Sequence, residues 1–191
     1  MLEFLQNIDS QLLLFINSFH SPFFDSLMWQ ISGKLLWMPL YVGILSYIIF
    51  KYRKKSIFII LAIIILIVIT DQISSGLIKN LVQRLRPSHN PALENMLHFV
   101  NGYKGGNYGF VSSHTANSFG VAIFLSLLFK NRIFTCLILL YASLVAYSRM
   151  YLGVHYPGDV LGGIVVAFLS ALFVYWLLER FFLKKSEDAS H

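Results

Sequence analysis

The stretch SRMYLGVHYPGDVLGG, residues 148–163, combines an arginine, a histidine and an aspartate at the edge of an apolar run. Pro157 suits the first turn of a helix, where its missing N–H costs nothing. Asp159 can reach back to His155 and accept a hydrogen bond from one imidazole nitrogen, which leaves the other nitrogen free to attack. Arg149 adds a fork of N–H donors. The alternative without chemistry is a Gly/Pro-rich turn with a His–Asp cap.

A second polar cluster, KNLVQRLRP, supplies two more cations. Lys79 and Arg86 are seven residues apart, close to two helical turns, so both side chains should point the same way. Pro87 is expected to end this helix just after Arg86. Basic residues at the end of a span also snorkel to the interface, and that alternative suffices for this pair taken alone.

The third cluster, VSSHTANS, directly precedes another apolar run. Ser112 or Ser113 suits the N-cap of that helix, which leaves backbone N–H groups and the positive end of the helix dipole available to an anion. His114 lies beside this helix start. The alternative is a simple cap with an interfacial histidine.

Together the clusters contain three cations, a helix N-terminus and two histidines, one with a carboxylate partner. Phosphoryl transfer needs such a set: positive groups for the phosphoryl oxygens, an in-line nucleophile and an acid for the leaving oxygen. A metal is the other use of His and Asp. The spacing lacks the two-histidine pattern of zinc hydrolases, and the cations would repel a divalent ion. The prediction is chemistry without a metal or other cofactor.

Composition places these residues in a membrane protein. Hydrophobic residues make up 57% of the 191 residues, against roughly 45–50% in soluble domains. The net charge of +6 comes from short basic clusters between apolar runs and not from one stripe, so no nucleic-acid partner is predicted. The single Cys136 excludes a disulfide within the chain. No cleaved signal peptide is expected, because the N-terminus lacks its pattern.

Five apolar runs predict an all-α fold, a polytopic membrane bundle of about five transmembrane helices. The runs are 35–50, 57–77, 115–129, 133–147 and 160–178. The whole chain, 1–191, is predicted to be one domain with an N-terminal region 1–34, a transmembrane bundle 35–182 and a cytoplasmic tail 183–191. Region 1–34 has apolar residues at helical spacing but is too short and polar to span, which favours helices lying in the membrane interface. A re-entrant element is the alternative.

Basic residues predict the orientation. They fill the connections 51–55 and 130–132 and follow the last run at 180–185, so these three segments are expected in the cytoplasm. The alternation then places residues 78–111 and 148–159 together on the opposite face. All three polar clusters are therefore predicted to be extracytoplasmic.

The clusters resemble the three signatures of the type-2 phosphatidate phosphatase superfamily, integral-membrane lipid phosphatases that share a phosphate site with vanadium haloperoxidases. Residues 79–87 match a lysine, six residues and Arg-Pro, and residues 148–159 match Ser-Arg, five residues, His, three residues and Asp. Residues 111–114 read Val-Ser-Ser-His where the family has Pro-Ser-Gly-His. Ser113 in place of glycine keeps a backbone N–H but implies a stiffer turn and a narrower pocket.

The resemblance implies a role for each matched residue. His155 is the nucleophile that forms a phosphohistidine, Asp159 orients it, and His114 is the general acid for the leaving group. The implied phosphate ligands are Lys79, Arg86, Ser112, Ser113 and Arg149. Arg84 has no counterpart in the signatures. No metal or cofactor is implied, and the implied location is a bacterial-type inner membrane.

The short bacterial members that dephosphorylate undecaprenyl diphosphate resemble the chain most, so this lipid is the predicted substrate. Phosphatidylglycerophosphate, phosphatidate and lipid A phosphates remain alternatives, and the loop 88–110 with the N-terminal helices is expected to discriminate among them. A transporter should place charges deep in several spans, and only Asp71, a possible partner of Lys79, does so. A non-catalytic lipid-phosphate binder need not keep both histidines. His89 and His98 are expected to be surface residues.

Overall fold

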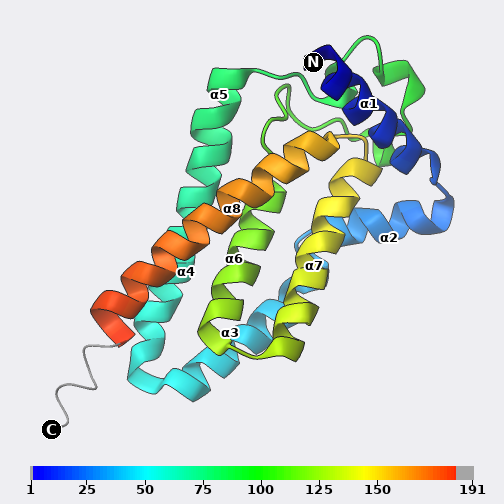
Figure 1. The fold of residues 1–191 in the computed structure, drawn as a ribbon. Helices are drawn as coiled ribbons and strands as arrows, with labels where there is room; N and C mark the ends of the chain where they lie inside the picture. Colours follow the sequence, from blue (N-terminus) through cyan, green and yellow to red (C-terminus); the bar gives the residue numbers. More distant parts are fainter. Residues whose placement is uncertain (1, 184–191) are drawn as a thin grey trace, which may run out of the picture.

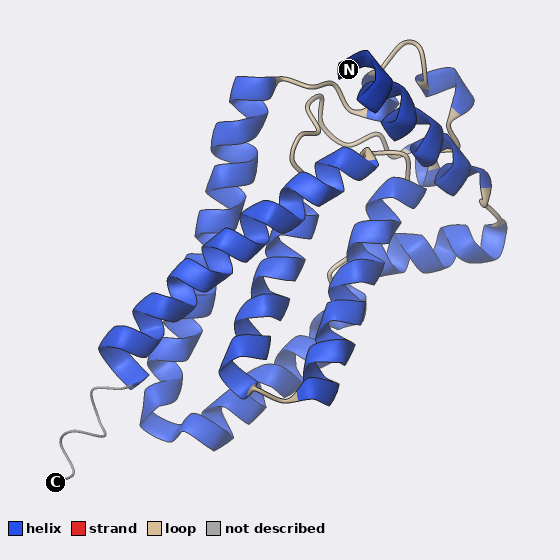
Figure 2. Ribbon diagram, viewed as in Figure 1, coloured by secondary structure: helices blue, strands red, loops and turns tan. Residues whose placement is uncertain are grey.

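The computed structural model describes residues 2–183, so that Met1 and all but the first residue of the predicted tail 183–191 lie outside it. Within the described residues the chain is helical, with loops and a single isolated β-bridge between Leu85 and Tyr108 (Figure 2). Long helices run side by side, and two N-terminal helices cover one end of them (Figure 1). This is the all-α membrane bundle that the apolar runs predict.

Each predicted run corresponds to a helix of the bundle. These helices are α3 (Met38–Tyr52), α4 (Ser56–Asp71), α6 (Ser113–Phe129), α7 (Arg132–Tyr151) and α8 (Pro157–Leu178). Within the described part, three helical stretches are long and apolar enough to cross a membrane, namely Leu35–Val82, Arg132–Tyr151 and Pro157–Leu183. The first contains both α3 and α4, and α6 is a shorter apolar helix of 17 residues. The number of five membrane spans therefore stays a prediction.

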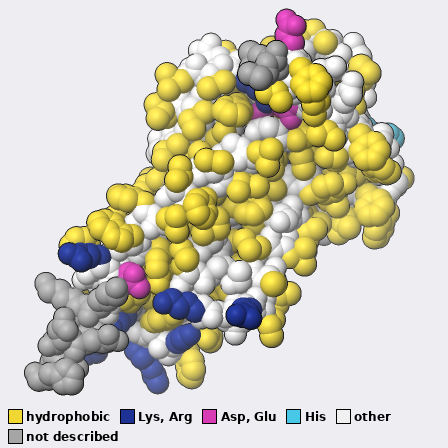
Figure 3. All heavy atoms as spheres, in the orientation of Figure 1, with side chains coloured by type: hydrophobic (Ala, Val, Ile, Leu, Met, Phe, Trp, Pro, Cys, Tyr) yellow, Lys and Arg dark blue, Asp and Glu magenta, His cyan; other side chains and the backbone are white. Residues whose placement is uncertain are grey.

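Short basic turns close the end of the bundle away from the N-terminal helices. Arg53 (φ 51°) breaks the path between α3 and α4, and Lys130 (φ 51°) ends α6 in the left-handed region. Asn131 then caps α7 by accepting a hydrogen bond from the Phe134 N–H at 2.9 Å. Lys and Arg side chains gather at this end, while hydrophobic side chains cover the flanks of the helices (Figure 3). The distribution is that of a membrane protein with one basic face.

The helix that begins with α4 differs from the prediction. After Asp71 it widens into a π-helical segment, Gln72–Ile78, and continues as α5 (Lys79–Val82). It ends at Gln83, which takes the left-handed conformation (φ 49°). The expectation of a helix reaching Pro87 was therefore wrong. Arg86 lies on an extended segment beyond the helix, because Gln83 turns the chain four residues before the proline.

Helix α6 is central and packs against α4, α7 and α8. Small residues allow α6 and α8 to approach closely. A Cβ atom on Gly163 would lie 2.8 Å from the Ser112 carbonyl oxygen, so the start of α6 rests on the backbone of α8. A Cβ atom on Gly120 would lie 3.3 Å from Thr70 Cγ2 on α4. This tight packing fixes the start of α6 relative to α8.

The N-terminal region forms two helices, α1 (Leu2–Ser18) and α2 (Pro22–Ser32). Ser21 caps α2 and Pro22 occupies its first position, where its missing N–H costs no hydrogen bond. Helix α2 lies across the direction of the bundle helices (Figure 1). Leu13, Met28 and Ile31 are buried, whereas large apolar side chains such as Phe15 are exposed. An interfacial position for these exposed faces stays a prediction.

Candidate active site

The third cluster forms the predicted histidine–carboxylate pair at the start of α8. Asp159 Oδ2 accepts a hydrogen bond from the Tyr156 N–H at 3.0 Å and lies 3.3 Å from His155 Nδ1. The capping reach of Asp159 across Pro157 is thus observed. His155 and Asp159 are 1% and 0% exposed, so the pair is fixed by burial as well as by hydrogen bonds. This leaves Nε2 as the imidazole nitrogen not directed at Asp159.

Asp159 has a further partner that the sequence reasoning missed. Arg84 Nη1 donates to Asp159 Oδ1 at 2.9 Å, and Arg84 Nη2 donates to Asp9 Oδ2 on α1 at 2.6 Å. The Arg84 guanidinium also lies 3.9 Å from the centre of the Tyr156 ring. Asp9 and Arg84 are far apart in sequence and belong to no shared motif, so only the fold brings them to Asp159.

The second cluster caps α6 as predicted, and Ser112 is the N-cap. Its N–H donates to the Asp159 carbonyl oxygen at 3.0 Å, which ties the second cluster to the third. Lys79 Nζ donates to Ser113 Oγ at 2.8 Å, and Ser75 Oγ lies 2.7 Å from the same atom. Ser113, which replaces the expected glycine, therefore links the first and second clusters through its side chain.

Two arginines complete the cluster. Arg86 Nε donates to the Tyr108 carbonyl oxygen at 3.1 Å. Arg149 donates to Ser32 Oγ and, at 3.4 Å, to the Tyr103 hydroxyl oxygen. Within the described residues, Arg86 Nη1 and Arg149 Nε are buried with no hydrogen-bond partner. Each arginine thus keeps a desolvated donor for an anion.

The cations set the electrostatics around His155. Burial, followed by the charges of Arg86, Arg149 and Lys79, lowers the pKa of His155 well below its usual value. The imidazole is therefore neutral at pH 7, as a nucleophile must be. Burial also tends to raise the pKa of Tyr103, but the hydrogen bond from Arg149 and the positive charges of Arg149 and Arg86 lower it overall. Both effects indicate a site with excess positive charge.

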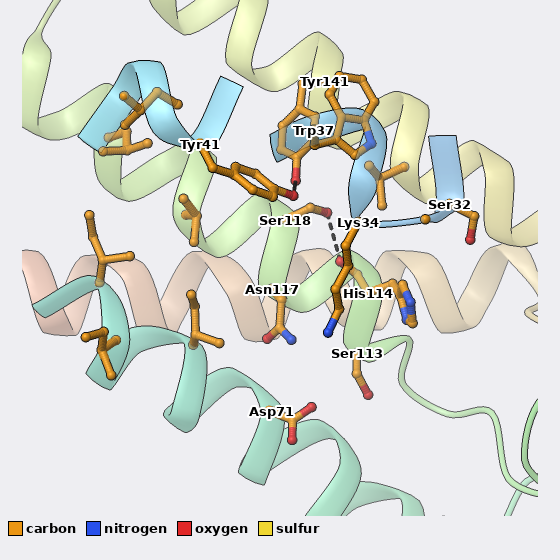
Figure 4. A pocket seen from close by; sticks show the side chains of 18 of the residues that line it. Ser32, Lys34, Trp37, Tyr41, Asp71, Ser113, His114, Asn117, Ser118 and Tyr141 are labelled. Carbon is orange, nitrogen blue, oxygen red and sulfur yellow. Dashed lines mark hydrogen bonds between the residues drawn. The ribbon is translucent and has the colours of Figure 1, made fainter. Parts of the chain in front are cut away.

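His114 lies between this cationic cluster and a large cavity. The positive charges of Arg149, Arg86 and Lys79 interact electrostatically with the His114 imidazole, as they do with that of His155. The cavity has a volume of about 710 Å³, and His114, Lys79, Arg86 and Ser113 line its polar end. Figure 4 shows His114, Asn117 and Ser118 on one face of α6. The Lys34 side chain points into the cavity near them, and Asp71 lies on the facing helix.

The rest of the cavity is apolar and extends between α3, α4, α6 and α7. Its lining includes Tyr41, Ile44, Leu45, Ile48, Ile60, Ile63, Ile64, Ile67, Val121, Leu125, Tyr141 and Val145. Two of these contribute hydroxyl groups, since Tyr41 and Tyr141 share a hydrogen bond of 2.8 Å. The cavity therefore joins a cationic end to a long apolar end, which suits an amphipathic anion.

Three further predictions concern Asp71, His98 and a metal site. Asp71 accepts a hydrogen bond from Ser75 Oγ at 3.4 Å. Its negative charge acts on Lys79, but the two side chains form no ion pair within 4.0 Å. His98 is half-buried, and its Nε2 lies 2.8 Å from Asp25 Oδ2, so it is a contact of the N-terminal helices and no free surface residue. Among residues 2–183 no group of three or more metal-ligating side chains could hold an ion.

Despite the early helix end, the structure brings the predicted residues together. The starts of α5, α6 and α8, the end of α7 and the loop after α5 bring together Lys79, Ser112, Ser113, His114, His155, Asp159, Arg149 and Arg86. A family model described as the PAP2 superfamily matches residues 58–183, which include all three clusters. The chain belongs to the PAP2 superfamily. The resemblance noted from the motifs is thereby confirmed.

Several PAP2-type phosphatases resemble the chain along most of its length. It is 42% identical over 192 residues to a lipid A 4'-phosphatase of Bacteroides thetaiotaomicron, a match that covers 98% of this chain and 84% of that protein. A solved PAP2-type phosphatidylglycerolphosphate phosphatase of Bacillus subtilis superposes with a TM-score of 0.69 at 25% identity, covering 93% of this chain and 87% of that one.

Two BcrC proteins are more distant PAP2 relatives. The bacitracin transport permease protein BcrC of Bacillus licheniformis is 31% identical over 138 residues, which is 71% of this chain and 63% of that protein. The undecaprenyl-diphosphatase BcrC of Bacillus subtilis is 40% identical over only 60 residues, 31% of this chain and 30% of that protein. This chain is thus an integral-membrane PAP2 lipid phosphatase.

Proposed function

We propose that this PAP2 phosphatase removes the phosphate group of a lipid A through a phosphohistidine formed on His155. The observation that carries the substrate is the 42% identity over 98% of the chain to a lipid A 4'-phosphatase. The observation that carries the mechanism is the buried pair of His155 Nδ1 and Asp159 Oδ2.

In the first step His155 Nε2 attacks phosphorus and the bond from phosphorus to the leaving oxygen breaks. The electron pair of that bond stays with the leaving oxygen. The negative charge of the bound phosphate offsets the surrounding cations, so that His114 can hold a proton and supply it to this oxygen. Asp159 holds the Nδ1–H side of the His155 ring and stabilises the charge that develops there. The position of His114 at the edge of the cavity supports this role, because the leaving group must lie on that side.

The phosphoryl oxygens bind to the cationic cluster. Arg86 Nη1 and Arg149 Nε are buried donors without a protein acceptor, and Lys79 lies against Ser113 at the start of α6. Together with the backbone N–H groups of the helix start they neutralise the equatorial oxygens as charge shifts in the transition state.

In the second step a water molecule attacks the phosphorus of phosphohistidine. The bond between phosphorus and Nε2 breaks, inorganic phosphate leaves, and His155 is restored. His114, deprotonated after the first step, accepts the proton of this water. The protein cations perform the work that metal ions perform in other phosphoryl transferases, so the reaction is proposed to be independent of metals.

The cavity supports a lipid substrate of this site. A phosphate at the cationic end places the rest of the molecule in the space of about 710 Å³, whose far end is lined largely by Ile, Leu and Val side chains. Burial of hydrocarbon there stabilises binding by ~25 cal/mol per Å² removed from water. The loop 88–110 contributes Tyr103 and Tyr108 to the arginine contacts and is proposed to shape the polar part of the substrate.

Undecaprenyl diphosphate is the second candidate substrate. The resemblance to the short bacterial members of the family favours this lipid, and the undecaprenyl-diphosphatase BcrC is a relative over 60 residues. That match is far shorter than the one to the lipid A 4'-phosphatase, so lipid A stands first. A diphosphate would also need room for a second phosphate beside His114, where Lys34 faces the cavity (Figure 4).

Purified protein in detergent, offered lipid A, undecaprenyl diphosphate, phosphatidylglycerophosphate and phosphatidate, tests the function. We expect phosphate release to be fastest from lipid A, with a product lighter by one phosphate in mass spectrometry. Faster turnover of undecaprenyl diphosphate would favour the second candidate, and no release from any lipid would contradict both. Activity should persist in EDTA, and its loss there with recovery on adding zinc or magnesium would overturn the metal-free mechanism.

The site is proposed to face away from the cytoplasm, in a bacterial inner membrane. Reporter cysteines in a Cys136→Ala background test this. Met96→Cys lies in the site-side loop and is 65% exposed, whereas Lys54→Cys lies in the exposed basic turn. An impermeant thiol reagent applied to spheroplasts should label Met96→Cys and spare Lys54→Cys. The opposite labelling would place the site in the cytoplasm.

A further inference from the structure

Asp159 carries a polar connection that extends away from the reacting atoms. Its Oδ2 faces His155 and the Tyr156 N–H, and its Oδ1 accepts from Arg84 at 2.9 Å. Arg84 is the one residue among those described that forms an ion pair with both Asp159 and a second carboxylate, that of Asp9 on α1. Asp9 Oδ1 in turn accepts the Gly158 N–H at 2.7 Å.

Asp159 is more deeply buried than Asp9 and Arg84. The Asp159 side chain is 0% exposed, that of Asp9 13% and that of Arg84 24%. A fully buried carboxylate is costly unless a cation and hydrogen bonds stabilise it. Among the described residues, Arg84 is the one permanently charged cation that forms an ion pair with this carboxylate. Arg84 therefore supplies the charge that keeps Asp159 ionised.

The contacts of Arg84 also fix the orientation of the Asp159 carboxylate. The two ends of the guanidinium fork are held by different carboxylates, and its flat face lies on the Tyr156 ring at 3.9 Å from the centroid. A guanidinium held at both ends and on one face has little freedom to turn. Asp159 Oδ1 is thereby fixed, and Oδ2 is aimed at His155.

We propose that Arg84, held by Asp9, is a positioning residue that keeps the Asp159 carboxylate ionised and aimed at His155, so that docking of α1 governs the nucleophile. This inference rests on the proposed function, since it gives Arg84 a task only if His155 attacks phosphorus. It also gives the N-terminal helix a direct part in the reaction. Figure 1 shows α1 lying over the end of the bundle where α8 begins.

Steady-state kinetics of full-length variants on an aryl phosphate test the proposal. Arg84→Gln should lower kcat by roughly 10–100-fold and change KM by less than about threefold, because misalignment affects attack more than binding. Arg84→Lys keeps the charge but lacks the planar fork, so its kcat should lie between those of Arg84→Gln and the unmodified protein.

The contribution of Asp9 is separable. Asp9→Asn should lower kcat less than Arg84→Gln and have no further effect in an Arg84→Gln background, because it acts through Arg84. Gly158→Ala leaves every charge in place but puts a Cβ atom 2.8 Å from Asp9 Oδ2, and it should reproduce the Asp9→Asn effect. The matched control is Glu3→Gln, which removes an exposed carboxylate from the same helix α1 and should leave kcat unchanged.

The outcomes separate the two proposals. If the unmodified protein hydrolyses no phosphate ester, the proposed function fails. If it is active and Arg84→Gln keeps kcat within about twofold, the positioning role is overturned. The role is equally overturned if Arg84→Lys is no better than Arg84→Gln, or if Arg84→Gln fails to fold while Asp9→Asn and Gly158→Ala fold with normal kcat.

Discussion

The two sides of His114 differ in how firmly their side chains are held. On the side of α8 the polar groups are buried and joined by hydrogen bonds from Asp9 through Arg84 and Asp159 to His155. On the side of α3 and α4 the cavity is lined mainly by aliphatic side chains, whose contacts are not directional. One side can hold a phosphoryl group in a fixed geometry, and the other can accept apolar groups of various shapes.

This difference suggests a division of labour. The polar side would perform the same phosphoryl chemistry on any substrate, and the apolar side would decide which lipid is bound. Relatives named for different substrates, a lipid A 4'-phosphatase and an undecaprenyl-diphosphatase, fit that division. Changes on the polar side should affect all substrates equally, and changes on the apolar side should affect long lipids only.

Among the replacements that compare the two sides, that of Arg86 on the polar side should have the largest effect. Arg86→Gln removes a buried donor to the phosphate and should lower kcat/KM by ~10²–10³-fold on lipid and aryl phosphates alike. Arg86 also lowers the pKa of His155, alongside burial, Arg149 and Lys79. Without this cation the pKa of His155 rises, so protonation removes the nucleophile at higher pH. The acid limb of the kcat/KM profile should therefore move to higher pH, and an unmoved limb would contradict the electrostatic account.

The second largest effect is expected at Gly109, where the loop 88–110 approaches Asp159 closely. A Cβ atom on Gly109 would lie 2.8 Å from Asp159 Oδ2 and 3.2 Å from Arg86 Cγ. Gly109→Ala should displace Asp159 and lower kcat by up to ~10²-fold on every substrate. Gly106→Ala is the matched control, because its Cβ atom would meet nothing within 4 Å. Equal activity of the two variants would show that Asp159 tolerates displacement.

A change in the apolar side should have the smallest and most selective effect. Ile67 lines the cavity, and Ile67→Trp should fill part of it and lower kcat/KM for long-chain lipid phosphates by roughly 10-fold. A short aryl phosphate should be hydrolysed as before. Ile65→Trp on the same helix, whose side chain is 51% exposed and does not line the cavity, is the control. A matching loss on the aryl phosphate would break the division between the two sides.

Most of the fold and the motif residues could be predicted from the sequence. Apolar runs locate helices because length and composition decide whether a segment spans a membrane. The cap at Ser112 and the reach of Asp159 across Pro157 are local features, within four residues along the chain, and the structure places both as expected. Local rules therefore identified the starts of α6 and α8, where the candidate site lies.

Features set by contacts between distant segments could not be predicted. The Gln83 turn ends the α4–α5 helix early, although no glycine or proline marks it. The Arg84 contacts join residues 75 positions apart on either side, and Ser32 of α2 reaches Arg149 from the N-terminal region. No pattern within one segment encodes such pairs. The cavity was missed for the same reason, since residues of α2, α3, α4, α5, α6 and α7 line it.

The central claim gives the two histidines different tasks, and rapid-quench kinetics of His155→Ala and His114→Ala on an aryl and an alkyl phosphate tests it most directly. His155→Ala should form no acid-labile phosphohistidine and be inactive on both. His114→Ala should lose ~10²–10⁴-fold on the alkyl phosphate and much less on the aryl phosphate, whose leaving group needs little protonation. Phosphohistidine in His155→Ala, or equal losses on both substrates in His114→Ala, would contradict the account.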